Sequence, residues 1–358
     1  MASAPNPLGS VPAKQKKDTG SSRTTLPTKL SRSIPEKGTK SKRWALTQKT
    51  RANMKLVLNH KNDEEIIKRD MAKGQAYWDM WANSYDDEFV SSIDDDMEGI
   101  IKEKIVHYAS ALEEDPGQYP FAFDFGCGPG LYLPFLARYF KLVGGCELSK
   151  KATQIAEARC FMYPHVKVTT FDLTNTDKNP LMPSILKELK NKENELGSVT
   201  KPSFGVCANV LIAVEEKTRK HILNSIYRNM NDNGIVLFVL PSLESALYCN
   251  YRMQVDKPKD GIIDPGLTIS ETRPKQARHI LRGIISRDDV PTKHYIREEA
   301  EYWLSKNGFK VLETHKVPYE WETEYPCAED VSPWIQASPF PRPFDLLIIC
   351  RKSSKLTT

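Results

Sequence analysis

The sequence lacks any apolar stretch close to the roughly 20 residues that a membrane-spanning helix needs. Its mean hydropathy is −0.49, and its first residues contain no apolar segment of the kind found in a secretory signal. We therefore expect neither an integral membrane protein nor a secreted one. The expected location is the cytoplasm.

Cysteine is scarce and follows no recognisable spacing. The chain has 7 cysteines in 358 residues, and none of them belongs to a CxxC pair. A zinc site needs such spacings and a disulfide framework needs an even set, so neither is expected. Several cysteines lie within apolar runs, which favours buried, reduced thiols. No metal site is predicted.

Charge is distributed unevenly along the chain. Residues 1–55 hold thirteen lysines and arginines against Asp18 and Glu36, whereas the net charge of the whole chain is only +5. The same segment is rich in Ser, Thr, Pro and Gly without a helical or strand period, which predicts a disordered basic tail. The tail could be a solubilising extension, a nuclear or plastid targeting segment, or an arm that binds nucleic acid or an acidic protein.

Short apolar runs alternate with helical patterns from residue 121 onward. The predicted strands are 121–125, 142–146, 166–171, 204–211, 235–240, 309–314 and 344–350. The predicted helices are one that starts near Asp63, followed by 97–112, 131–140, 151–162, 217–230 and 297–307. Strands that alternate with helices indicate the α/β class, with a mostly parallel sheet covered on both faces.

We expect one domain over residues 56–352, with N-terminal helices in 56–115 and two insertions. The first insertion, 175–200, contains a charged helix-like piece and is predicted to lie at the surface. The second, 256–293, is rich in Pro and Gly and could form a lid over a substrate. Residues 353–358 are expected to be disordered.

The strongest motif is Phe-Asp-Phe-Gly-Cys-Gly-Pro-Gly at residues 123–130, where the first predicted strand ends. Gly126, Gly128 and Gly130 would permit a sharp turn and let a ligand approach the backbone. The spacing is GxGxG, whereas the dinucleotide fingerprint is GxGxxG. Asp124 would disfavour a pyrophosphate, but it suits a ligand with an ammonium group, such as the methionine portion of S-adenosylmethionine.

This motif resembles the first motif of the class I S-adenosylmethionine-dependent methyltransferases, and further motifs follow in the order of that family. The resemblance implies a Rossmann-like, seven-stranded, mostly parallel sheet and S-adenosyl-L-methionine as cofactor. It implies that Glu147 binds the ribose hydroxyls and that Asp172 accepts a hydrogen bond from the adenine amino group. The implied cofactor residues are Asp124, Gly126, Cys127, Gly128, Gly130, Glu147, Leu148, Asp172, Leu173, Asn209 and Tyr85.

Two features point to a branch of this family. The Asn/Asp-Pro-Pro-Tyr signature of many amino-group methylating enzymes is absent, and Asn209-Val210-Leu211-Ile212 stands in its place. The stretch 77–86 resembles the leading helix of the small-molecule branch, which includes quinone and sterol methylating enzymes and in which a tyrosine closes over the cofactor. Tyr85 is the matching residue here. The resemblance therefore implies methyl transfer to a small, partly apolar acceptor through O-, N- or C-methylation.

Structural alternatives remain for these residues. Asp124 and the glycines could form an ordinary turn, and Glu147 and Asp172 could be solvated strand ends. Tyr85 could pack in the core, and Asn209 could cap a strand.

Functional alternatives also remain. One is a protein or RNA methyltransferase that uses the basic tail to hold its partner, and another is a non-catalytic regulator that binds the cofactor without turnover. A general base is needed only if the acceptor is protonated. The candidates for that role are His279, His294, Tyr251 and Glu244.

Overall fold

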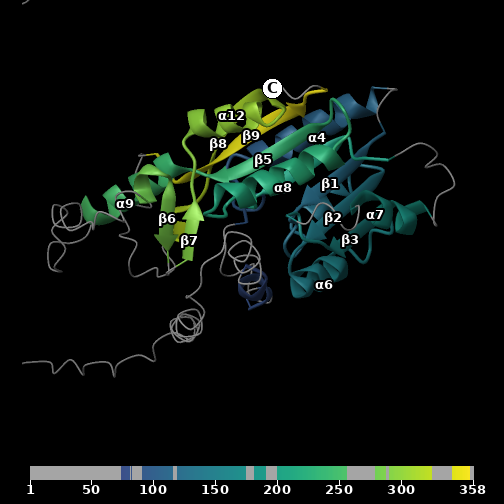
Figure 1. Cartoon of the computed structure of the whole chain (residues 1–358), viewed down its shortest axis with the longest axis horizontal. Helices are drawn as coiled ribbons and strands as arrows, with labels where there is room; N and C mark the ends of the chain where they lie inside the picture. Colours follow the sequence, from purple (N-terminus) through teal and green to yellow (C-terminus); the bar gives the residue numbers. More distant parts are fainter. Residues whose placement is uncertain are drawn as a thin grey trace, which may run out of the picture. The chain divides into compact units, whose positions relative to one another are not determined.

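The computed structural model describes residues 74–80, 82, 91–115, 119–174, 181–190, 200–255, 279–287, 290–324 and 341–354 (Figure 1). The chain divides into two units, Met1–Ala52 and Asn53–Thr358, and every described residue lies in the second. The predicted tail 1–55, Tyr85 and most of the predicted lid lie outside the described residues. Among the helices described, none is long and apolar enough to cross a membrane.

Seven strands form one sheet in the order β3-β2-β1-β4-β5-β9-β8. They are β1 (Phe121–Phe125), β2 (Leu142–Glu147), β3 (Val166–Thr170), β4 (Phe204–Ala208), β5 (Ile235–Pro241), β8 (Phe309–Pro318) and β9 (Phe344–Lys352). Strands β1 to β5 pair in parallel, whereas β9 runs antiparallel to both β5 and β8. The predicted Rossmann-like sheet of the class I methyltransferase fold is confirmed by this strand order.

Helices cover both faces of the sheet, as predicted. One face, the α4 face, carries α4 (Ile100–Glu113), α5 (Leu133–Leu136) and α6 (Lys150–Arg159). The other, the α8 face, carries α7 (Leu181–Lys190), α8 (Glu216–Asn229) and α12 (Arg297–Lys306). Because successive strand residues point to opposite faces, Ala122 packs in the α4-face core and Phe123 in the α8-face core.

Helix α5 is shorter than the predicted helix 131–140. Beyond Leu136, the backbone N–H groups of Arg138 and Tyr139 donate to carbonyls three residues earlier, so the chain tightens into turns. Pro134 lies in the first turn of α5, as predicted, where its missing N–H leaves no helical bond unmade.

The predicted surface insertion 175–200 contains a core helix, which corrects that interpretation. Helix α7 buries Leu181, Met182, Ile185 and Leu186 in the α8-face core, so it serves as the crossover between β3 and β4. These residues recur at helical spacing on one side, whereas Lys187 is exposed. Lys187, one of the charged residues that suggested a surface segment, therefore lies on the outer side of an amphipathic helix.

Several elements after β5 were not predicted. Helix α9 (Leu243–Val255) follows β5 almost directly, and β6 (Ile284–Arg287) and β7 (Val290–Lys293) form an antiparallel hairpin within the predicted lid. Leu243 and Ala246 of α9 form a small core with Ile285 of β6. A short helix, α13 (Trp321–Glu324), follows β8. Residues 74–80 of the predicted N-terminal helix are helical, whereas its predicted start near Asp63 lies outside the described residues.

Candidate functional site

The glycine loop lies at the point where the strand order of the sheet reverses. The chain leaves β1 for β2 and β3 on one side, and later returns to β4 and β5 on the other side. In open α/β sheets, ligands bind in the crevice at the carboxyl ends of the strands at such a point. Asp124, Glu147, Asp172 and Asn209 all lie at the carboxyl ends of neighbouring parallel strands, so the fold brings them to one edge.

All three glycines of this loop have a left-handed φ, and at Gly126 and Gly130 an added Cβ would also collide with a neighbour. Gly126 has φ 80 and Gly130 has φ 85, which are left-handed conformations that favour glycine. A Cβ on Gly126 would lie 2.4 Å from Cγ2 of Val210, and a Cβ on Gly130 would lie 2.9 Å from Cβ of Ala156. The absent side chains therefore let the loop after β4 and helix α6 pack directly against the glycine loop.

Hydrogen bonds fix the glycine loop to the end of β2. The backbone N–H groups of Gly126 and Cys127 both donate to the carbonyl oxygen of Cys146, at 2.9 Å each. The N–H of Gly128 donates to Oε2 of Glu147 at 3.0 Å. Cys127 is itself buried, and burial raises the pKa of its thiol well above the usual value. The hydrogen bonds from Gly126, Cys127 and Gly128 thus hold the loop against the end of β2.

Asp124 is a buried carboxyl group with an unsatisfied oxygen. Its side chain points to the α4 face, as that of Ala122 does, and is only 1% exposed. Its Oδ2 is buried and has no hydrogen-bond partner in the described part of the chain. Burial, and then the negative charge of Glu147, raise the pKa of Asp124 to about 8. A buried polar atom left without a partner is a place where a ligand donor is expected.

Glu147 lies beside Asp124 on the same face, because Val143, four residues earlier on β2, packs in the α4-face core. The residue is 8% exposed. Its Oε1 accepts a hydrogen bond from the N–H of Ser149 at 2.9 Å, in addition to the bond from Gly128. Burial raises the pKa of Glu147, and these N–H donors oppose that shift.

Asp79 is a further carboxylate at this edge, and the sequence reasoning missed it. It lies in the helical segment 74–80, and its Oδ1 accepts a short hydrogen bond from Oγ of Ser149. Ser149 is also the N-cap of α6, where its Oγ accepts from the N–H of Ala152 at 3.0 Å. Asp79 lies between the aromatic residues Trp78 and Trp81 in the sequence. The spacing of the aromatic residues predicted the helix, but it could not predict the contact between Asp79 and Ser149.

Asp172 and its neighbours form the third part of the site. Oδ1 of Asp172 accepts hydrogen bonds from the N–H and the hydroxyl of Thr174, at 2.8 and 2.7 Å, so one oxygen is used by a local turn. Leu173 is buried in the α8-face core, whereas Leu148 is partly exposed. Leu148 is therefore the better placed of the two leucines to contact a ligand.

Asn209 follows β4 and combines a strained backbone with an unsatisfied amide. Its φ is 55, which few residues other than glycine adopt but asparagine tolerates. Its N–H donates to the carbonyl of Val239 at 2.9 Å, and its Oδ1 is buried without a partner among the described residues. Such a combination is typical of functional sites.

The structure does not group the four candidate bases with these residues. His279 is exposed, and Tyr251 is 61% exposed on α9. Glu244, at the start of α9, forms an ion pair of 2.9 Å with Nζ of Lys316. His294 is buried directly after β7, with Nδ1 3.3 Å from the carbonyl of Thr292.

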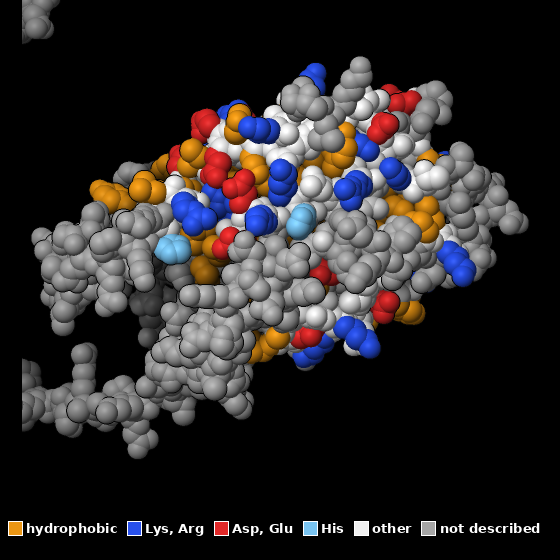
Figure 2. Space-filling model, in the orientation of Figure 1, with side chains coloured by type: hydrophobic (Ala, Val, Ile, Leu, Met, Phe, Trp, Pro, Cys, Tyr) orange, Lys and Arg blue, Asp and Glu red, His pale blue; other side chains and the backbone are white. Residues whose placement is uncertain are grey.

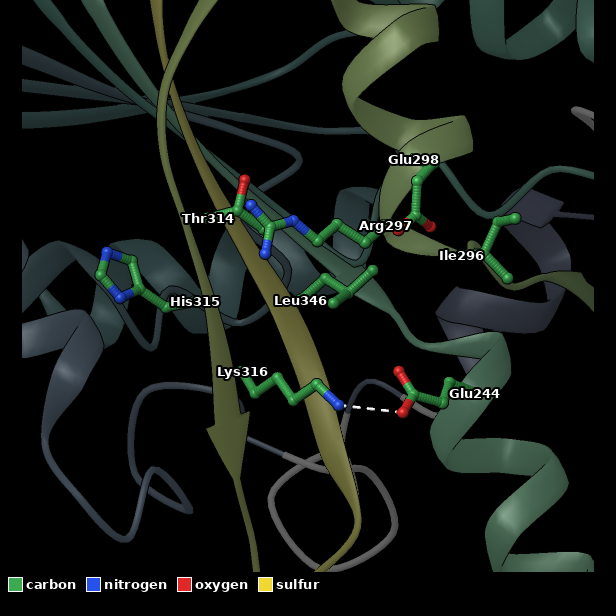
Figure 3. Close-up of a pocket in the computed structure, with 8 residues that line it drawn as sticks. All are labelled: Glu244, Ile296, Arg297, Glu298, Thr314, His315, Lys316 and Leu346. Carbon is green, nitrogen blue, oxygen red and sulfur yellow. Dashed lines mark hydrogen bonds and ion pairs between the residues drawn. The ribbon is translucent and has the colours of Figure 1, made fainter.

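An open pocket of about 420 Å³ lies elsewhere (Figure 3). It is lined by Glu244, Ile296, Arg297, Glu298, Thr314, His315, Lys316 and Leu346. Lys316 pairs with Leu346, which packs in the α8-face core, so this pocket opens on the α8 face beside the edge strand β8. Since Asp124 and Glu147 project from the α4 face of β1 and β2, this pocket is separate from them.

No family model and no curated protein matches the chain. Solved structures are similar at low identity. A SAM-dependent methyltransferase from Methanosarcina mazei is 14% identical, with 66% of this chain and 94% of that chain covered and a TM-score of 0.41. The magnesium protoporphyrin IX methyltransferase of Synechocystis PCC 6803, with bound SAM, is 15% identical, with 82% and 100% covered and a TM-score of 0.43. A SAM-dependent methyltransferase from Anabaena variabilis is 12% identical, with 79% and 94% covered and a TM-score of 0.45.

Proposed function

We propose that this protein is an S-adenosylmethionine-dependent methyltransferase that acts on a small, partly apolar acceptor. One observation carries the proposal. Asp124 lies beside the glycine loop, at the point where the strand order of the sheet reverses, and its Oδ2 is buried without a hydrogen-bond partner in the described part of the chain. A cationic group on a ligand would satisfy this oxygen.

The neighbouring residues fit the rest of such a cofactor. Each oxygen of Glu147 accepts one backbone hydrogen bond and keeps a second lone pair, which suits a pair of ribose hydroxyls. Asp172, with one oxygen used by Thr174, has a second oxygen for an adenine amino group, and Leu148 is exposed enough to pack on the ring. These assignments follow from the family resemblance and from the placement of the strand ends.

When bound, the cofactor supplies an electrophilic methyl group on a positively charged sulfur. The chain then has to hold the nucleophilic atom of the acceptor within about 3 Å of that methyl carbon and to exclude water. Asn209 suits the first task, since its buried Oδ1 can accept a hydrogen bond from a donor on the cofactor or the acceptor. No general base is proposed, because none of the four candidate bases is grouped with the cofactor residues in the described part of the chain and a base is needed only where the acceptor carries a proton.

The test of the cofactor site is isothermal titration with S-adenosylhomocysteine. We expect binding in the micromolar range, weakened at least tenfold, about 1.4 kcal/mol, by Asp124→Ala or Gly128→Val. Glu298→Gln is the matched control, because Glu298 is exposed at the start of α12. Wild-type affinity in the folded Asp124→Ala variant would contradict the assignment.

The acceptor class has its own test. Incubating the full chain and a cell extract with methyl-labelled cofactor should place the label in small molecules. Label in protein or RNA would favour the polymer-modifying alternative, particularly if removal of residues 1–55 lowered affinity in a salt-dependent way. On the side of the molecule shown in Figure 2, basic and acidic side chains are interspersed among apolar ones. Binding of cofactor without any transfer would favour a regulator.

A further inference from the structure

Ser149 binds two carboxylates at once. It is fully buried, at 0% exposed, in the turn between β2 and α6. Its backbone N–H donates to Oε1 of Glu147 at 2.9 Å, and its hydroxyl donates to Oδ1 of Asp79. Its Oγ accepts from the N–H of Ala152 at 3.0 Å, and its carbonyl accepts from the N–H of Thr153 at 2.9 Å. Every polar group of Ser149 therefore has a partner, and the residue cannot turn without breaking one of these bonds.

Asp79 is the member of this network that lies far away in the sequence, in the helical segment 74–80. A hydroxyl has one proton, and because Oγ of Ser149 accepts from Ala152, that proton belongs to the bond with Asp79. Without this acceptor the hydroxyl would be a buried donor that has lost its partner, which favours another rotamer of Ser149. That change would break the N-cap bond and loosen the first turn of α6, together with the backbone N–H that orients Glu147.

The charge of Asp79 acts against Glu147, whereas its hydrogen bond to Ser149 supports it. Burial raises the pKa of Glu147 above the usual value, and the negative charge of Asp79 raises it further. Charge alone therefore disfavours the ionised form of Glu147, which is the form that accepts hydrogen bonds at both oxygens. Any benefit of Asp79 to ligand binding must come from the geometry that it imposes through Ser149. This difference separates a positioning role from an electrostatic one.

We propose that Asp79 is a positioning residue for the ribose: through Ser149 it holds Glu147 in the orientation that accepts the ribose hydroxyls. The inference rests on the proposed function and deepens it, because it assigns part of the cofactor specificity to a residue outside the strand ends. The N–H of Gly128 fixes Oε2 of Glu147 at 3.0 Å, and the N–H of Ser149 fixes Oε1. With both oxygens held, the remaining lone pairs keep one direction, as a bidentate acceptor requires.

Titration calorimetry of the full chain with S-adenosylhomocysteine and its 2′-deoxy analogue measures the contribution of one ribose hydroxyl. The wild type should bind the analogue about tenfold more weakly, because the analogue lacks a donor for Glu147. Asp79→Ala should weaken binding of S-adenosylhomocysteine about tenfold and leave the affinity for the analogue nearly unchanged, so the preference disappears. Asp79→Asn removes the charge but keeps a carbonyl oxygen for Ser149, so it should preserve the preference. Equal weakening of both ligands by Asp79→Ala would overturn the proposal.

Two further variants separate positioning from a general loss of structure. Ala76→Gly weakens the same helical segment at an exposed residue, so it should leave the preference for the ribose hydroxyl intact. In a Glu147→Gln background, adding Asp79→Ala should not weaken S-adenosylhomocysteine binding further, because both changes remove the same contact. Losses that simply add in the double variant would contradict the proposal.

The remaining outcomes distinguish this inference from the proposed function. If Asp79→Ala did not fold, Ser149→Ala removes the same hydrogen bond from the other partner, and an intact preference in that variant would refute the inference. Equal affinity of the wild type for S-adenosylhomocysteine and its 2′-deoxy analogue would refute it as well, while leaving the cofactor assignment in place. Absence of binding by the wild type to both S-adenosylmethionine and S-adenosylhomocysteine would reject the methyltransferase assignment itself.

Discussion

Substituting Gly126 by alanine tests whether the glycine loop and the loop after β4 are in direct contact. Gly126 has φ 80, where an L-residue costs about 1–2 kcal/mol. The new Cβ would also lie 2.4 Å from Cγ2 of Val210, an overlap that typically costs about 1–3 kcal/mol when the core must shift. Gly126→Ala should therefore lower the free energy of unfolding by about 2–5 kcal/mol, a large share of the stability of an ordinary domain.

Urea unfolding followed by circular dichroism measures this loss, and Gly99→Ala separates its two parts. Gly99 also has a left-handed φ, of 67, but a Cβ there would have no neighbour within 4 Å. Gly99→Ala should cost only the backbone part, about 1–2 kcal/mol. Adding Val210→Ala to Gly126→Ala should recover the steric part and leave the backbone part. The reasoning fails if Gly126→Ala costs no more than Gly99→Ala, or if Val210→Ala recovers nothing.

Two further predictions concern contacts outside the glycine loop. Tyr295→Phe removes the buried hydroxyl that donates to the carbonyl of Leu211 at 2.6 Å, which should lower the free energy of unfolding by about 1–3 kcal/mol in a urea titration. Hydrogen bonds from Lys104 and Tyr108 lower the pKa of Glu313 to about 2 from the usual 4.5, so its stabilising effect is present above pH 4.5 and is lost as the pH falls towards 2. Glu313→Gln should cost about 1 kcal/mol at pH 7 after solvent screening, and the difference from wild type should vanish near pH 2.

The sheet could be predicted because each buried strand is an uninterrupted apolar run with a clear boundary. Strand β1 begins and ends at the predicted residues, since Pro120 precedes it and Gly126 ends it. The predicted order of strands and helices then fixes a parallel sheet, because parallel strands need crossover helices. Burial of all five β1 residues explains why no alternating pattern was present.

The elements that were misjudged or missed have weak or misleading local patterns in the sequence. Helix α7 is amphipathic, and its charged residues hid the apolar side that packs on the sheet. The hairpin β6–β7 has four-residue strands in a Pro- and Gly-rich segment, too short for a reliable period. A local signal for α9 was available: Ser242 follows β5, and its Oγ accepts from the N–H of Ser245, which is the arrangement of an N-cap.

The candidate site could likewise be predicted from the sequence only in part. Spacing in the sequence was enough to expect Asp124, Glu147 and Asp172 at one edge, because each follows or ends a parallel strand. Spacing could not show which carboxyl oxygens are already used. Asp172 shares one oxygen with Thr174, whereas Asp124 keeps a buried oxygen without a partner among the described residues. Whether a buried carboxyl oxygen already accepts a hydrogen bond depends on residues that are far apart in the sequence. It can therefore be determined only from the folded structure.

The loop after β4, residues 209–214, connects the hairpin to the glycine loop. Its Leu211 and Ile212 carbonyls accept hydrogen bonds from the hydroxyl of Tyr295 and the N–H of Lys293, while Val210 packs on Gly126. Nζ of Lys293 is buried and pairs with Glu299 of α12 at 2.6 Å, which anchors the segment after β7. A displacement of that segment would therefore move Val210 against Gly126 and change the backbone beside Asp124. Tyr295 lies on the α8 face of the sheet, whereas Asp124 projects from the α4 face. Because close-packed side chains transmit a displacement to their neighbours, we expect substitutions at Tyr295 to alter cofactor affinity all the same.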